Sequence, residues 1–77
     1  MSPRLDFGRR VKRRRQALTL SQPELAKRAG ISRGYLARVE LGMQSPTLEV
    51  IERLARALRV TPGELLGGTE ARGKKQK

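Results

Sequence analysis

Cysteine and histidine are both missing from this sequence of 77 residues. Without cysteine there is no disulfide to stabilise the fold and no thiol for chemistry. Without histidine the chain lacks the most frequent general base and the commonest metal ligand. The seven acidic residues include one aspartate, Asp6, and form no cluster at ligand spacing. We therefore expect no enzyme activity, no metal site and no cofactor.

Aromatic residues and long apolar runs are also scarce. The aromatic residues are one Phe and one Tyr. No apolar run approaches the roughly 20 residues that a membrane span requires. No apolar segment follows the N-terminus as it would in a secretion signal. We expect a cytoplasmic protein with no membrane partner, and the sequence indicates no small-molecule ligand.

Negative charge is the third shortage, because 18 Lys and Arg stand against 7 Asp and Glu, for a net charge of +11. A balance this basic predicts a polyanionic partner such as nucleic acid. The charge is uneven: residues 1–20 carry seven basic side chains and one acidic one, whereas residues 46–66 carry three of each. This asymmetry suggests that one face of the fold is directed at a polyanion.

Four residues that favour helix N-termini divide the chain into helical segments. Ser21 and Thr61 each precede a glutamate by three positions, which is the capping-box pattern. Ser32 and Thr47 stand before two further segments. Apolar residues between these caps recur at three- and four-residue intervals, and no alternating strand pattern occurs. The sequence therefore predicts an all-α fold of five helices, the first over residues 4–17.

The helical spacing also predicts which side chains are buried. We expect one folded domain over residues 1–67 and a basic, disordered tail over residues 68–77. The predicted core comprises Phe7, Val11, Leu18, Leu20, Leu25, Ala26, Ala29, Ile31, Leu36, Val39, Leu48, Ile51, Leu54, Leu58, Val60 and Leu65.

Residues 22–41 contain two short helical segments that are separated only by Gly30-Ile31-Ser32. Glycine permits a tight turn at a helix end, and Leu36 and Val39 are spaced to anchor the second segment to the core. Two short helices joined by such a turn are typical of a helix-turn-helix unit. The positions of the second helix that need not pack are expected to point outward.

These outward positions suit the major groove of DNA. The groove is about 12 Å wide and admits one α-helix, whose N-terminal half meets the base edges. The guanidinium groups of Arg33 and Arg38 match guanine O6 and N7, while Gly34 allows close approach and Ala37 can touch a thymine methyl. We expect the helix at about residues 32–41 to enter the groove with these four residues at the bases.

The stretches "LSQPELAKRAGIS", "YLARVELG" and "SPTLEVIERLARAL" carry a family resemblance. Over about residues 5–66 the chain resembles the Cro/C1-type (XRE) helix-turn-helix family of prokaryotic and phage transcription regulators. The resemblance implies a compact five-helix lambda-repressor-like domain and a sequence-specific transcriptional regulator, such as a repressor, whose partner is double-stranded DNA.

The resemblance also implies roles for individual residues. Gln22, Ser32 and Tyr35 fall at positions that contact DNA phosphates. Arg15 and Glu40 fall where the family often has a partly buried ion pair, although Arg14 competes with Arg15 for that place.

Two departures from the family pattern add to these expectations. The loop after Gly42 lacks the family's usual Lys or Arg, so Gln44 and Ser45 are its candidate phosphate contacts. Arginines of the first helix can compensate, and we expect Arg14 to reach solvent and contact phosphate. Thr19 stands where a glycine is common, which predicts a strained turn.

One such helix reads only a few base pairs, so a complete operator requires two. Two-fold dimers read half-sites about 34 Å apart, and family members often dimerise through their C-terminal helices. The sequence predicts a homodimer on a palindromic operator. The candidate interface residues, which could equally close the monomer's own core, are Val60, Pro62, Leu65 and Leu66.

Two other functions fit the same sequence. An antitoxin or adaptor would keep the fold and act mainly by binding a protein partner. A generic basic protein would bind nucleic acids without sequence preference.

Overall fold

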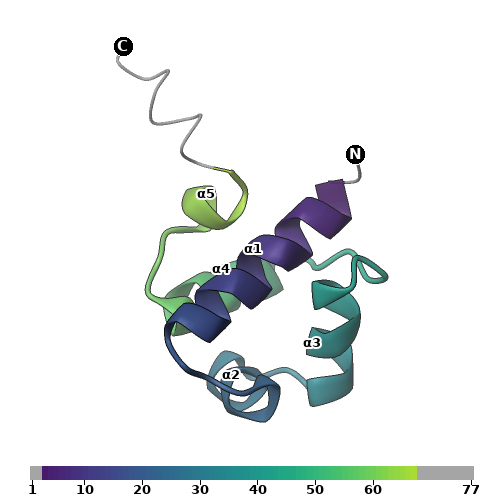
Figure 1. Cartoon of the computed structure of the whole chain (residues 1–77). Coiled ribbons are helices and arrows are strands. Elements are labelled where there is room, and N and C mark those ends of the chain that lie inside the picture. The colour runs from purple at the N-terminus through teal and green to yellow at the C-terminus, as the bar shows by residue number, and fades with distance from the viewer. Residues whose placement is uncertain (1–2, 68–77) are drawn as a thin grey trace.

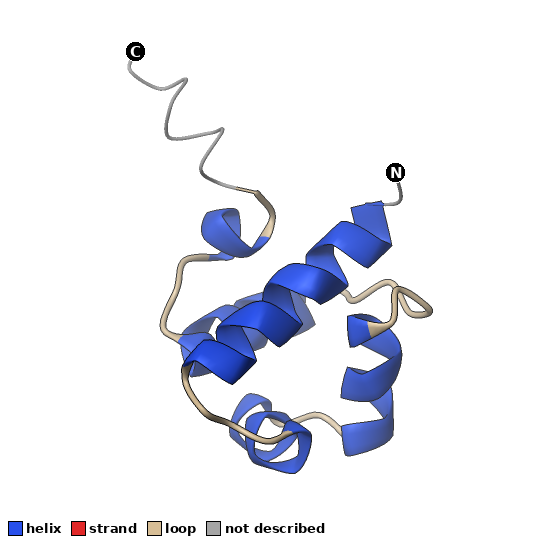
Figure 2. Ribbon diagram, viewed as in Figure 1, coloured by secondary structure: helices blue, strands red, loops and turns tan. Residues whose placement is uncertain are grey.

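The computed structural model describes residues 3–67, which form five helices and no strand (Figure 2). The predicted all-α, five-helix fold is confirmed, and the first helix begins one residue earlier than expected. The tail predicted over residues 68–77 lies outside the described residues. No helix within the described range is long and apolar enough to cross a membrane. The helices are α1 (Pro3–Ala17), α2 (Gln22–Ala29), α3 (Arg33–Glu40), α4 (Leu48–Leu58) and α5 (Pro62–Leu65).

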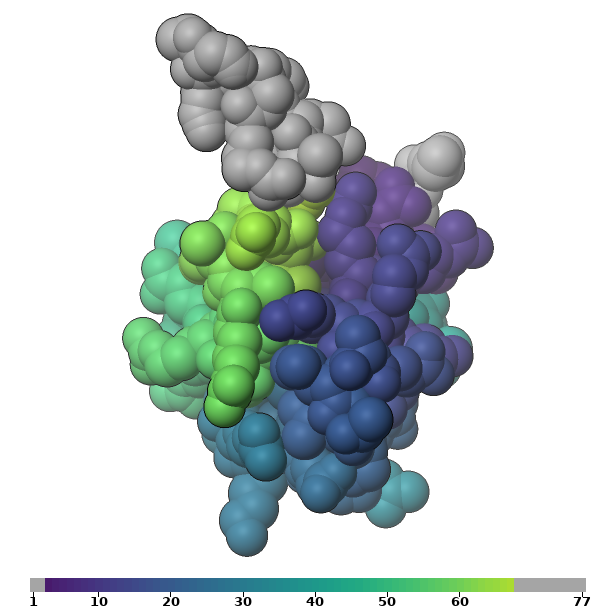
Figure 3. Space-filling model, turned by 60° about the vertical axis from the view of Figure 1, so that its left-hand side comes forward, coloured from purple at the N-terminus to yellow at the C-terminus, as the bar shows by residue number. Residues whose placement is uncertain are grey.

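Helix α1 is central to the arrangement, because it contacts α3, α4 and α5. It crosses in front of α4 in Figure 1, with α3 on one side and α2 below. Helix α2 contacts both α3 and α4, so the helix pair α2–α3 is attached to the body of the domain. Figure 3 shows α5 and the chain that leads into it, in green and yellow-green, lying against α1, in purple and blue.

The predicted N-caps are present at all four positions. The Ser21 hydroxyl accepts a hydrogen bond from the Glu24 N–H at 3.2 Å, and the Ser21 N–H donates to Glu24 Oε1 at 2.8 Å. Hydrogen bonds from the backbone and then the side chain of Ser21 hold the pKa of Glu24 below its usual value. The box therefore contributes to stability above the ordinary glutamate pKa, and this contribution is lost as the pH falls through the lowered value. Thr61 forms the second box with Glu64, and Ser32 and Thr47 cap α3 and α4.

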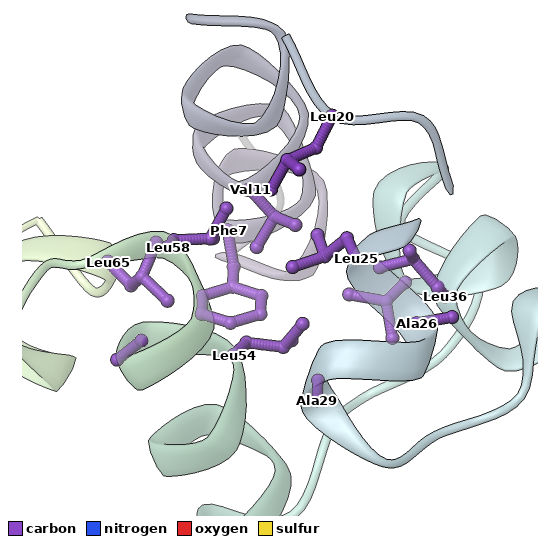
Figure 4. Packing of buried hydrophobic residues seen from close by; sticks show 12 residues of the cluster. Phe7, Val11, Leu20, Leu25, Ala26, Ala29, Leu36, Leu54, Leu58 and Leu65 are labelled. Carbon is purple, nitrogen blue, oxygen red and sulfur yellow. The ribbon is translucent and has the colours of Figure 1, made fainter. Parts of the chain in front are cut away.

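All five helices contribute to one apolar core (Figure 4). Phe7 and Val11 of α1 meet Leu54 and Leu58 of α4, with Leu25 of α2 beside them. The buried hydrophobic residues are Phe7, Val11, Leu20, Leu25, Ala26, Ala29, Leu36, Val39, Leu54, Ala55, Leu58 and Leu65. The predicted core members Leu18, Ile31, Ile51 and Val60 are only partly buried and pack against this cluster.

The prediction that Leu48 is a core residue is wrong, because its side chain is 67% exposed. Burial increases along the apolar stripe of α4, from Leu48 through the half-buried Ile51 to the fully buried Leu54 and Leu58. The first turn of α4 therefore projects beyond the helices that cover the rest of the stripe.

Helices α1 and α3 approach one another at Gly8, a residue to which the sequence analysis gave no role. A Cβ built at Gly8 would lie 2.3 Å from the carbonyl oxygen of Val39 and 2.7 Å from that of Glu40. Real Cβ atoms essentially never come this close to another heavy atom. Since both obstructing atoms belong to the backbone of α3, the crossing requires glycine.

The turn between α1 and α2 is strained, as the sequence predicted. Thr19 has φ 57°, in the left-handed region that a β-branched residue rarely adopts. This conformation costs about 1–2 kcal/mol for a residue with a Cβ and almost nothing for glycine.

Replacing Thr19 with glycine should therefore stabilise the domain by about 1 kcal/mol, once the greater freedom of unfolded glycine is included. In a domain of this size that gain raises Tm by about 4–8 °C in thermal unfolding followed by circular dichroism. Thr47→Gly is the matched control: Thr47 has φ −74° and caps α4, so this variant should lose a few tenths of a kcal/mol. A lower Tm for Thr19→Gly would contradict the proposed strain.

Candidate nucleic-acid interface

Helix α3 is fixed at its start and along its inner face. At its start the Ser32 hydroxyl accepts a hydrogen bond from the Tyr35 N–H at 3.0 Å. The preceding turn is closed by Gly30, which has φ 71° at the end of α2. On the inner face Leu36 and Val39 are 0% exposed. The helix is therefore fixed to the core without using its outer side.

The outer side of α3 carries the residues predicted to meet the bases. Arg33, Gly34 and Arg38 are exposed, and Ala37 is half-buried. Of the residues predicted to meet phosphates, Ser32 is exposed and Tyr35 is half-buried. The two arginines are thus presented to solvent from a rigid element, as a contact with base edges requires.

A buried ion pair joins α1 to α3. Arg15 Nε donates to Glu40 Oε2 at 2.7 Å, and Arg15 Nη2 donates to Glu40 Oε1 at 3.0 Å. The side chains are 11% and 3% exposed. Arg15 Nη1 also donates to the carbonyl oxygen of Leu20 at 3.0 Å. The expected pair is therefore present, and Arg15 rather than Arg14 provides its cation.

Gln22 connects α2 to the same carboxylate. Its Nε2 donates to Glu40 Oε1 at 3.0 Å, so Glu40 accepts hydrogen bonds from both α1 and α2. A side-chain amide carries two N–H bonds, so one donor of Gln22 remains for a further acceptor such as a phosphate. Glu40 therefore ties the last turn of α3 to both neighbouring helices.

The predicted phosphate contact of Arg14 is not supported by its position. Arg14 Nε donates to the carbonyl oxygen of Leu58, the last residue of α4, at 2.9 Å. Cations at a helix C-terminus satisfy carbonyl groups that have no partner within the helix. Arg14 is therefore half-buried between α1 and α4, where it stabilises the end of α4.

The predicted phosphate contacts after Gly42 lie in the loop between α3 and α4. Gln44 is half-buried and Ser45 is exposed. Gln44 Oε1 also accepts a hydrogen bond from Arg38 Nε at 3.4 Å, a contact that the sequence analysis did not anticipate. The loop therefore contacts the outer side of α3 through this bond, while Leu41 and Met43 beside it expose apolar side chains.

The apolar residues near the C-terminal end of the described chain divide into two groups. Leu65 is 2% exposed and belongs to the core, so it offers no surface to a second copy. Leu66 is 55% exposed, Pro62 is exposed and Val60 is half-buried. Three of the four residues predicted for a dimer interface therefore remain accessible.

The arrangement of these helices has counterparts among known proteins. A family model described as "Helix-turn-helix" matches residues 11–65. The control protein C.BamHI of Bacillus amyloliquefaciens is 36% identical over 67 residues, which cover 86% of this chain and 83% of that protein. An uncharacterised HTH-type transcriptional regulator of Mycobacterium tuberculosis is 38% identical over 54 residues, or 70% of this chain. The match spans only 39% of that regulator, and 44% of the immunity repressor of Bacillus phage phi105.

Solved structures show the same fold. The restriction-modification controller protein C.AhdI of Aeromonas hydrophila superposes with a TM-score of 0.78 and 41% identity, over 79% of this chain and 92% of the controller. A complex of the SinR and SinI proteins contains a chain that superposes with a TM-score of 0.78 and 28% identity, over 91% of this chain and 69% of that one.

Proposed function

Because this chain belongs to the Cro/C1-type helix-turn-helix family, we propose that it is a transcriptional regulator that recognises one operator sequence through α3. In this proposal α3 enters the major groove, with Arg33, Gly34, Ala37 and Arg38 at the base edges. Its relatives are regulators rather than enzymes, in keeping with a protein that works by binding alone.

One observation carries the proposal, namely the division of α3 into two sides. The inner side is fully used by Leu36, Val39 and Glu40, whereas Arg33 and Arg38 make no contribution to the core. A helix built for packing alone has no need of two exposed arginines around a glycine. Helix propensity would favour alanine over Gly34 at an exposed position by about 1 kcal/mol, which supports a role for the missing side chain.

Phosphate contacts would fix the orientation of α3 in the groove. Gln22, Ser32 and Tyr35 lie at or near the N-termini of α2 and α3, where backbone N–H groups also favour anions. Such contacts carry no sequence information but set the register of the reading helix. We assign these three residues, together with Ser45, to the DNA backbone.

A second copy of the chain completes the proposal. Two copies related by a two-fold axis would read half-sites about 34 Å apart in a palindromic operator. Leu66, Pro62 and Val60 are the accessible apolar residues near α5 that we assign to this contact. Sedimentation of the free protein and of its complex with a selected duplex measures this directly, and one copy per operator would contradict it.

Arg33→Ala should relax the choice of base at one position of each half-site. We expect the preference there to fall by about 1–3 kcal/mol, because a bidentate arginine–guanine contact contributes that much discrimination. The measurement is a binding selection from random duplexes, repeated with the wild-type and variant proteins at one salt concentration.

Arg56→Ala is the control for this experiment, since Arg56 is an exposed arginine on α4 and its loss changes the net charge by the same amount. Arg56→Ala should slightly lower the affinity for all duplexes and change no base preference. An unchanged preference profile for Arg33→Ala would refute its assignment as a base reader, and equal affinity of the wild-type protein for all duplexes would refute specific recognition altogether.

A second candidate function is protein binding, as in an antitoxin or adaptor. The likeness to a chain from the SinR–SinI complex and the exposure of Leu66 favour it. In that case Leu66→Glu would abolish function, while Arg33→Ala and Arg38→Ala would leave it intact. Loss of function in Arg33→Ala and Arg38→Ala supports DNA reading, whereas Leu66→Glu does not separate the two functions because Leu66 also belongs to the proposed dimer contact.

A further inference from the structure

We infer that Gln44 is a positioning residue that holds Arg38 ready for one base pair. The inference rests on the proposed function, in which Arg38 reads a base. It changes the expected role of Gln44 from a phosphate contact to a residue that acts through Arg38. The partner of the positioned guanidinium is a guanine, read through its O6 and N7.

The first observation is the geometry of the loop that carries Gln44. The Met43 N–H donates to the carbonyl oxygen of Arg38 at 2.8 Å, and the Gly42 N–H donates to that of Val39 at 3.1 Å. With Gly42 at φ 76°, these bonds form a Schellman motif at the end of α3. Met43, the residue directly before Gln44, is thus hydrogen-bonded to the backbone of Arg38. This bond fixes the position of Gln44 relative to Arg38.

The second observation concerns the surface on which the guanidinium lies. A Cβ built at Gly34 would be 3.6 Å from Arg38 Nη1. Arg38 therefore extends back along α3 by one turn, over the space that Gly34 leaves open. Gln44 Oε1 accepts from Nε on the same group at 3.4 Å. The side chain thus lies over the turn of α3 that contains Gly34, and its hydrogen bond to the loop holds it there.

The two arginines of α3 differ in this respect. Within residues 3–67, the side chain of Arg33 has no hydrogen bond, whereas that of Arg38 has the bond to Gln44. An unrestrained arginine loses rotamer entropy when it binds, and a side chain already restrained loses less. Restraint also narrows the set of bases that the group can reach, which increases discrimination.

The atom that Gln44 engages is suited to this role. Arginine presents five N–H donors, and Gln44 occupies only the one on Nε. Both terminal nitrogens remain to donate to O6 and N7 of one guanine. A loop acceptor on Nε therefore orients the guanidinium without competing with the base.

The first test uses the free protein and no DNA. NMR relaxation of the arginine Nε–H groups reports how far each guanidinium is restrained on the picosecond–nanosecond timescale. We expect the order parameter of Arg38 Nε to exceed that of Arg33 in the wild type and to fall to the Arg33 level in Gln44→Ala. Gln44→Glu, which keeps an acceptor oxygen, should retain the restraint, and Gln16→Ala, an exposed glutamine of α1, should leave it unchanged. Equal order parameters in wild type and Gln44→Ala would overturn the inference.

The second test measures base preference. Arg38→Ala first identifies the base pair that Arg38 reads, and the affinity of each protein is then measured for the four duplexes that differ at that pair. We expect Gln44→Ala to reduce the preference there by about three- to tenfold, the net effect of one ordinary, solvent-exposed hydrogen bond. Preference at the pair read by Arg33 should stay unchanged, and Gln44→Glu should restore the lost discrimination.

The outcomes separate the inference from the proposal on which it rests. If Gln44→Ala weakens all four duplexes equally, Gln44 contacts phosphate and the inference fails, while recognition through α3 stands. If Arg38→Ala alters no base preference, the assignment of Arg38 as a base reader fails and the inference fails with it. If Gln44→Ala loses base preference only at the pair read by Arg38, and Gln44→Glu restores that preference, the result supports both the inference and the proposed function.

Discussion

Glu40→Ala should remove about 3–5 kcal/mol from the free energy of unfolding, which is a large part of the stability of a domain of this size. Glu40 accepts both hydrogen bonds of the Arg15 fork at 2.7 and 3.0 Å and a third from Gln22 at 3.0 Å. The variant leaves the Arg15 guanidinium, 11% exposed, without its counter-ion. An unpaired buried charge is the costly part of this loss.

Urea denaturation followed by circular dichroism measures the change, with Glu49→Ala as the matched control. Glu49 also pairs with an arginine, since Arg53 Nη2 donates to its Oε2 at 2.6 Å, but its side chain is 71% exposed. Loss of such a surface pair costs less than about 1 kcal/mol. The double variant Arg15→Met, Glu40→Leu should lose less than Glu40→Ala, because neither charge is left alone. Similar losses of unfolding free energy for Glu40→Ala and Glu49→Ala would show that the buried network stabilises the fold no more than an exposed ion pair does.

Gly8→Ala should destabilise the domain by about 3 kcal/mol and move α3 relative to α1. The added methyl group would meet the Val39 carbonyl oxygen at 2.3 Å and the Glu40 carbonyl oxygen at 2.7 Å. Both atoms are part of the helix backbone, so no side-chain rotation relieves the contact. The higher helix propensity of alanine recovers about 1 kcal/mol and does not offset the overlap.

Gly34→Ala is the control, because it makes the same substitution in a helix at an exposed position. A Cβ there would meet only Arg38 Nη1, the end of a side chain, at an ordinary van der Waals distance of 3.6 Å. This variant should gain about 0.5–1 kcal/mol in the free energy of unfolding. The stability changes of the two alanine variants should therefore have opposite signs. Amide chemical shifts should also change at Val39 and Glu40 in Gly8→Ala. Unaltered stability and shifts would show that the helices separate without cost.

The helices, their caps and most of the core could be predicted from the sequence because these features depend on local rules. Ser21 with Glu24 and Thr61 with Glu64 form capping boxes within four residues of chain, and the structure has both. The ion pair of Arg15 and Glu40 spans 25 positions, and here the family resemblance supplied what local rules could not.

The features that sequence reasoning missed all depend on how segments far apart, or a loop and its helix, are placed in space. Gly8 is unremarkable within α1, and only the backbone of α3 shows why it is glycine. Leu48 fits the apolar period of α4, yet periodicity does not reveal where the neighbouring helices end. Arg14 has the charge of a phosphate contact, but the nearby carbonyl of Leu58 takes its Nε–H. The bond between Arg38 and Gln44 likewise depends on how the loop folds back.

The two-sided character of α3 has a consequence for re-engineering. Leu36, Val39 and Glu40 fix the helix, and they share no atoms with the exposed reading positions. If α3 reads DNA as proposed, substitutions at positions 33, 34 and 38 should change the recognised sequence while the fold keeps its shape. A library aimed at new operators should vary position 44 together with position 38. A new side chain at position 38 would otherwise lack a loop residue that orients it.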